Sequence, residues 1–184
     1  PDFNVLTFAA SQVKNALELL IMAGLIIPVT HSSANGIPLG AEGNIKKRKY
    51  LIADTGIFHR LSGLKISDIL LQGDLDLVNK GAIAELATGL ELVKAAPHSQ
   101  REELYFWHRE ARNSQAEIDF LTQRNNLIIP VEVKTGTKGS MQSLYIFLEE
   151  KKIKKGIRTS LENFSRYDKI DVIPLYAISK ILNS

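Results

Sequence analysis

One stretch of the sequence, EIDFLTQRNNLIIPVEVKTG at residues 117–136, constrains the fold of this chain more than any other. Two apolar runs flank a polar turn, and that arrangement predicts a β-hairpin. The predicted strands nevertheless carry Asp119, Glu132 and Lys134 at positions where apolar core residues are expected. Burying such charges without partners would cost several kcal/mol, so their presence beside a β-core requires an explanation.

The alternation of side chains along a strand sorts the hairpin residues into faces. The first strand is expected to place Glu117, Asp119 and Leu121 on one face, with Ile118 and Phe120 on the other. The second strand is expected to place Pro130, Glu132 and Lys134 on one face, opposite Ile129, Val131 and Val133. If the apolar faces pack together, the two carboxylates and the lysine converge on the other side of the hairpin.

These three side chains suit the chemistry of phosphodiester hydrolysis. Carboxylates on adjacent strands supply the hard oxygen ligands that Mg²⁺ or Mn²⁺ prefers. A lysine two residues beyond the second carboxylate can reach a water molecule or a phosphate oxygen, where it stabilises developing negative charge. The alternative is an exposed strand face that carries ordinary salt bridges, and the residues alone leave both interpretations open.

The first third of the chain has the pattern of a winged-helix segment, about residues 1–65. Apolar residues at helical spacing predict a helix over 11–24, with Ser11 as its N-cap and Gly24 as its end. A strand, a loop rich in Gly, Asn and Ser, and a second strand follow. The basic run Lys46, Lys47, Arg48 and Lys49 is expected at the tip or returning edge of the wing, where it would contact phosphates or simply remain solvated.

The remainder, about residues 75–184, is expected to form an α/β domain with a mixed central sheet flanked by helices. A helix over 79–96 precedes an aromatic strand at 103–110, the hairpin and a second helix over 139–152. The chain then ends in two strands, or in a strand and a closing helix. Mixed sheets covered by helices are the usual outcome of such an order.

Composition narrows the class of protein further. The chain of 184 residues has no cysteine, so it holds neither a disulfide nor a thiolate metal site. No apolar run approaches the roughly 18–20 residues of a membrane span, and no signal peptide is evident, so a cytoplasmic protein without a membrane partner is expected. The net charge of +3 is compatible with a DNA partner, and no feature specifies an oligomeric state.

The spacing of Asp119 and Glu132-Val133-Lys134 resembles the PD-(D/E)XK motif of restriction-endonuclease-like nucleases. Many members of that superfamily add a glutamate from a preceding helix, and Glu85 in GAIAEL occupies the matching place. Ile118 stands where the motif usually has proline. The resemblance implies a Mg²⁺- or Mn²⁺-dependent DNase in which Asp119, Glu132 and Glu85 hold the metal and Lys134 assists the attacking water.

A wider resemblance covers nearly the whole chain. The segments AGLIIPV, KYLIADTGIFHRLSG, GAIAEL, YFWHRE, AEIDFL and IIPVEVKTG are, in this order, similar to the C-terminal region of bacterial and archaeal AAA-type ATPases that end in a domain of unknown function. The resemblance implies an ATPase module upstream. This chain has no G-x-x-x-x-G-K-[ST], so ATP binding is not expected in it. The alternative to a nuclease is a catalytically idle module that recognises nucleic acid or a partner for the ATPase.

Residues just before the hairpin are weaker candidates for contact with phosphate. His108 and Arg109 precede the first strand, where either could contact phosphate, and Glu110 could support them. The four histidines (His31, His59, His98 and His108) lack metal-site spacing and are expected to be packing or surface residues. Trp107 is expected in the core rather than in a base-stacking platform.

Overall fold

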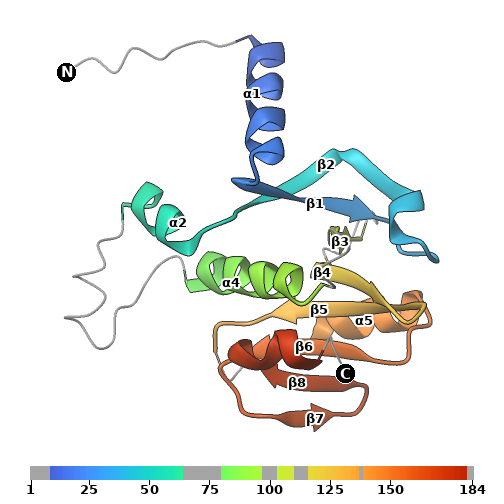
Figure 1. The fold of residues 1–184 in the computed structure, drawn as a ribbon. Helices are drawn as coiled ribbons and strands as arrows, with labels where there is room; N and C mark the ends of the chain where they lie inside the picture. The colour runs from blue at the N-terminus through green and yellow to red at the C-terminus, as the bar shows by residue number, and fades with distance from the viewer. Residues whose placement is uncertain (1–8, 64–79, 97–102, 110–115, 137–138, 182–184) are drawn as a thin grey trace, which may run out of the picture.

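The fold is described by a computed structural model that covers residues 9–63, 80–96, 103–109, 116–136 and 139–181. Eight strands form one mixed sheet in the order β2-β1-β3-β4-β5-β6-β8-β7, flanked by helices (Figure 1). The predicted α/β class with a mixed central sheet is therefore confirmed. His98 and Glu110 lie outside the described residues.

The elements have the following bounds. The strands are β1 (Ile26–Ser32), β2 (Gly43–Ile52), β3 (Leu104–His108), β4 (Glu117–Arg124), β5 (Leu127–Val133), β6 (Gly156–Ser160), β7 (Ser165–Tyr167) and β8 (Ile170–Pro174). The α-helices are α1 (Ala10–Met22), α2 (Thr55–Leu61), α4 (Lys80–Lys94), α5 (Gln142–Glu150) and α6 (Ile178–Ile181), and short 3-10 turns are η1 (Leu39–Glu42) and η2 (Leu175–Ala177).

Two hydrophobic cores lie on the two faces of the sheet. On one face α4 buries Leu86, Leu90 and Leu92 against strand residues that include Val131. On the other face α5 buries Leu144, Phe147 and Leu148. Helix α4 therefore defines one face of the sheet, called here the α4 face, and α5 defines the opposite one, the α5 face (Figure 1).

Helix α1 is present as predicted but begins earlier and is not packed into either core. Its N-cap is Ala9, not Ser11, and the chain leaves the helix through Gly24, whose φ of 72° is left-handed. None of its residues is buried, and Val13 is 54% exposed. Within the described residues no helix is both long and apolar enough to cross a bilayer.

The hairpin of β1 and β2 continues the central sheet. Strand β1 runs parallel to β3, with Val29 opposite Leu104 and His31 opposite Phe106. The sheet therefore passes without interruption from the segment interpreted as a winged helix into the segment interpreted as nuclease-like. The division into units at 1–65 and 75–184 remains a prediction, and most of the expected junction, residues 64–79, lies outside the described residues.

The hairpin of β4 and β5 is present, but the predicted faces of β4 are wrong. Ile118 packs in the α5-face core and Phe120 in the α4-face core, although simple alternation places them together. The cause is a β-bulge: Trp107 pairs with Ile118 and Tyr105 with Leu121, so β4 spans three residues where β3 spans two. On β5 the prediction is confirmed, because Ile129, Val131 and Val133 all pack toward the α4-face core.

Candidate functional site

The bulge sets the position of the first candidate carboxylate. The ladder between β4 and β5 ends at the pair Phe120 and Val131, and Asp119 lies just beyond it at the open end of the hairpin. The backbone N–H of Val133 donates a hydrogen bond of 2.7 Å to Asp119 Oδ2. Bulges next to active sites commonly re-aim a side chain in this way. Asp119 is thus oriented by the strand that carries the other two motif residues.

Glu132 is a buried carboxylate with an unused oxygen. The residue is 4% exposed, and its Oε1 lies 2.6 Å from Lys134 Nζ. Among the residues that the structure describes, its Oε2 has no hydrogen-bond partner. A buried charged oxygen without a partner is costly, since it loses hydration and receives nothing in return. The described residues therefore satisfy only one of the two carboxylate oxygens of Glu132.

A second charged group lies on the α4 face and consists of Lys49, Glu85 and Glu117; it is called here the Lys49 group. Lys49 Nζ is 3.0 Å from Glu85 Oε1 and 2.6 Å from Glu117 Oε1. The same ammonium lies 4.8 Å from the centroid of the Phe106 ring. Burial alone would lower the pKa of Lys49, but the two carboxylates outweigh it and raise the pKa above its ordinary value. The ammonium is therefore held in its charged form.

The ionisation of Asp119 is influenced by charges from both groups, the Glu132–Lys134 pair and the Lys49 group. Burial is the main reason that the pKa of Asp119 is raised to about 6, and the hydrogen bond from Val133 opposes this shift. Negative charge on Glu85 and on Glu132 raises the pKa further, while Lys49 lowers it. Asp119 thus lies within the fields of both charged groups, and a cation beside it would relieve the repulsion among the three carboxylates.

The four motif residues are only partly assembled. The structure pairs Glu132 with Lys134 and brings Glu85 within electrostatic range of Asp119, but in the described ranges no three Asp, Glu or His side chains are grouped closely enough to ligate one ion. Mg²⁺ typically binds through one or two carboxylates and keeps several waters. Asp119 and the free oxygen of Glu132, on adjacent strands, fit that kind of donor set.

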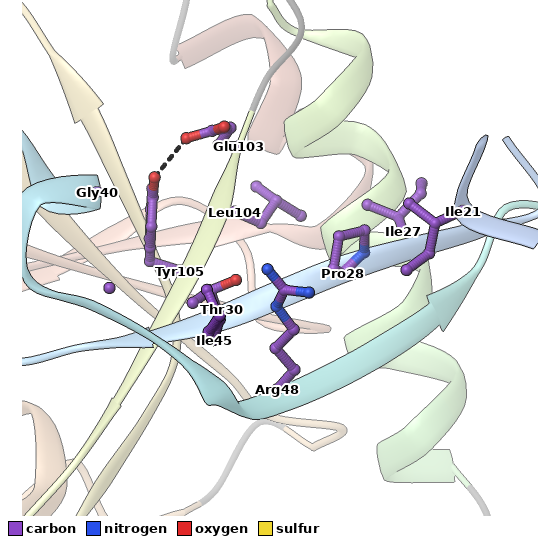
Figure 2. Close-up of a pocket in the computed structure, with 11 residues that line it drawn as sticks. Ile21, Ile27, Pro28, Thr30, Gly40, Ile45, Arg48, Glu103, Leu104 and Tyr105 are labelled. Carbon is purple, nitrogen blue, oxygen red and sulfur yellow. Dashed lines mark hydrogen bonds between the residues drawn. The ribbon is translucent and has the colours of Figure 1, made fainter. Parts of the chain in front are cut away.

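The basic run on β2 is divided between two faces of the sheet. Lys46, Lys47 and Arg48 are exposed, whereas Lys49 pairs across the ladder with Val29 and faces α4. Arg48 lines a pocket of about 380 Å³. Figure 2 shows its side chain near Pro28 and Thr30 of β1. Contact of these residues with nucleic acid remains a prediction.

Figure 2 also shows a hydrogen bond between two residues that line this pocket. The Tyr105 hydroxyl donates a hydrogen bond to a carboxylate oxygen of Glu103. Arg109, the other predicted phosphate contact, places its Nε 3.0 Å from Glu150 Oε2 of α5. Its guanidinium is therefore engaged with the α5 side of the sheet, away from the Lys49 group.

Sequence reasoning assigned Lys49 to a wing and gave Glu117 no role, yet both lie beside the candidate carboxylates. The sequence did carry one signal, because Glu117 precedes Asp119 by two residues on the same predicted strand. No such signal existed for Lys49, whose position depends on β2 lying next to β1 and on α4 crossing the same face.

Comparison with known proteins places the second part of the chain in a recognised sequence family. The family model for a domain of unknown function, DUF4143, matches residues 80–178. No curated protein and no solved structure matches the chain. The matched region contains β3 to β8 and the hairpin with both motif strands. Because the match spans more than half of the sequence, the chain belongs to the DUF4143 family.

Proposed function

We propose that this chain is a metal-dependent nuclease domain that hydrolyses phosphodiester bonds in DNA. The observation that carries the proposal is Glu132, buried to 96% with one carboxylate oxygen unpartnered among the described residues and the other held 2.6 Å from Lys134. A purely structural ion pair in a protein core normally satisfies its remaining lone pairs.

Asp119 and Glu132 would hold Mg²⁺ or Mn²⁺, and Glu85 would contribute from α4 directly or through water. When bound, such an ion polarises the phosphoryl group and lowers the pKa of a coordinated water. The Val133 N–H keeps the Asp119 carboxylate turned toward the hairpin opening. Lys134, one-third exposed, would neutralise charge that develops on a phosphate oxygen.

The wider setting belongs to the same proposal. The family match is compatible with the resemblance to the C-terminal region of AAA-type ATPases. In the full-length protein, an upstream module would bind ATP in the cytoplasm, and the hairpin of β1 and β2 would act as the wing of a winged helix. The exposed Lys46, Lys47 and Arg48 on edge strand β2 would then contact the DNA backbone.

The proposal is tested by cleavage of labelled linear, branched and single-stranded DNA in Mg²⁺ and in Mn²⁺. Glu132→Gln keeps the size of the side chain and removes its charge, so we expect metal-dependent cleavage to fall by at least about a hundredfold. Glu149→Gln, on the exposed side of α5, is the matched control and is expected to retain full activity. Equal activity of wild type and Glu132→Gln would exclude this site.

A catalytically idle module is the second candidate. It is favoured by Lys49, whose ammonium already neutralises Glu85 and Glu117. This alternative predicts DNA or protein binding without cleavage of any substrate. It also predicts that Mg²⁺ and Mn²⁺ leave the melting temperature unchanged, whereas a ligand that binds the native state raises it.

A further inference from the structure

A cleft of about 790 Å³, called here the lysine cleft, lies at the opposite end of β5 from Glu132. Its main lining segments are the loop after β1 (residues 34–37), the start of β5 (126–129) and the turn between α5 and β6 (151–157). The Lys151 ammonium donates a hydrogen bond of 2.8 Å to Asn35 Oδ1, which ties the first segment to the third. The lysine cleft is therefore separate from the candidate catalytic residues, and its volume is typical of a ligand site.

The apolar part of the lining is aliphatic. It consists of Ile37, Leu127, Ile128, Ile129, Ile153 and Ile157. Leu127 is 66% exposed and Ile37 is 43% exposed, so large apolar side chains meet solvent inside a concave surface. Exposed apolar side chains gathered in this way mark interaction sites. Among the described lining residues none is aromatic except outside this cleft, so it offers no platform on which a nucleobase would stack.

Lysines surround the aliphatic lining. They are Lys151, Lys152, Lys154 and Lys155. Of the described lining residues, Asp171 alone is acidic, and its Oδ1 lies 2.5 Å from Arg166 Nε. The lining thus has a formal charge of +3, equal to that of the whole chain. Lys152, Lys154 and Lys155 are exposed, and none of the three forms an ion pair with a described residue.

The turn that carries these lysines is held in place by the end of α5. The N–H of Lys152 donates to the carbonyl of Glu149, and the N–H of Ile153 donates to the carbonyl of Leu148, as in a Schellman motif. Lys152 has a left-handed φ of 55°, at the position where such motifs prefer glycine. Ile153 packs with Leu148 in the α5-face core. The fold therefore presents the lysines on both sides of Ile153 at defined positions.

We propose that the lysine cleft is a docking site for an acidic peptide segment of a partner protein. An aliphatic side chain of the segment would enter the cleft, and its carboxylates would pair with Lys152, Lys154 and Lys155. Charge complementarity and the aliphatic lining together select this occupant. A DNA backbone would satisfy the lysines but leave the aliphatic residues without contact, and membranes take up apolar side chains that protrude rather than line a hollow. The inference goes beyond the proposed nuclease function and does not depend on it.

The test is selection of a phage-displayed library of random short peptides on the 184-residue chain, followed by fluorescence polarisation with the enriched peptides. We expect the enriched peptides to combine Asp or Glu with Leu or Ile. The double variant Lys154→Gln, Lys155→Gln should bind them at least about tenfold more weakly than wild type. The matched control Lys46→Gln, Lys47→Gln makes the same charge change at exposed positions of β2 and should stay within about twofold of wild type.

A second pair of variants tests the aliphatic lining. Leu127→Ser should weaken binding at least about fivefold, because it removes apolar surface that the peptide would cover. Leu161→Ser is the control, since Leu161 is 68% exposed and does not line the cleft. The inference is wrong if no peptide is enriched, if the enriched peptides lack acidic or aliphatic residues, or if the variants bind as tightly as their controls.

Labelled single-stranded DNA and phosphatidylserine vesicles are tested against the same variants. The inference predicts that neither loses affinity through both Leu127→Ser and the double variant Lys154→Gln, Lys155→Gln. A loss through both would show that the lysine cleft binds nucleic acid or a membrane surface instead of a peptide.

Discussion

At the scale of single residues, the fold buries a carboxylate within the electrostatic range of other carboxylates, and this has an energetic cost. Asp119 shows this most clearly, because burial and the charges of Glu85 and Glu132 all oppose its ionisation. Functional side chains often lie in such unfavourable environments. Substitution of such a side chain commonly stabilises the protein. The stability of the metal-free chain should therefore depend on the ionisation of this carboxyl.

The sign of that dependence follows from the raised pKa. A native pKa of about 6, against about 4 in the unfolded chain, means that the native state holds the proton more tightly. The free energy of unfolding contributed by Asp119 therefore falls as pH rises from about 4 to about 6 and stays lower above that range. Asp119→Asn cannot ionise, and its amide oxygen can still accept the hydrogen bond from Val133.

We expect Asp119→Asn to be more stable than wild type by up to about 3 kcal/mol at pH 8, and to lose most of this advantage at pH 4. Urea denaturation in the presence of EDTA at the two pH values measures the difference. A variant that is less stable than wild type at pH 8 would show that the carboxylate makes stabilising contacts that outweigh its burial.

At the scale of elements, the contact between α4 and the sheet decides where Glu85 lies. Gly89 permits this contact, since a Cβ at its position would lie 2.3 Å from Leu51 Cδ1 and 3.0 Å from Phe120 Cζ. Both neighbours are core residues of the α4 face. The helix therefore approaches β2 and β4 more closely than an alanine would allow, which brings Glu85 toward Lys49.

Gly89→Ala is expected to destabilise the protein by about 1–3 kcal/mol, although alanine is ordinarily the better helix former. The matched control is Gly81→Ala in the same helix, where a Cβ meets nothing within 4 Å and a slight stabilisation is expected. Chemical denaturation of the two variants provides the comparison. Equal effects at both positions would mean that the close approach of α4 has no energetic role.

At the scale of the whole molecule, one sheet joins the segment before residue 64 to the family region. Removing residues 1–63 would leave the edge of β3 unpaired and uncover Phe106 and Leu104 of the α4-face core. Exposed strand edges promote aggregation. The loss of apolar burial also lowers the free energy of unfolding by several kcal/mol, which is a large part of its small total.

A fragment of residues 64–184 is therefore expected to lose cooperative thermal unfolding or to aggregate. Circular dichroism during heating and size-exclusion chromatography measure these two properties. If the fragment unfolds with the midpoint and cooperativity of the full chain, the two predicted units are independent domains, and the shared sheet contributes little to either.

The sequence by itself determined the α/β class, the hairpin at 117–136 and the faces of β5, because local alternation places Glu132 and Lys134 opposite Val131 and Val133. It could not reveal the faces of β4 or the location of Lys49. The bulge at Asp119 arises from the register against β3, and Lys49 enters the site because β2 joins β1 beneath α4. Both features depend on pairing between strands distant along the chain, which periodicity within a single segment does not encode.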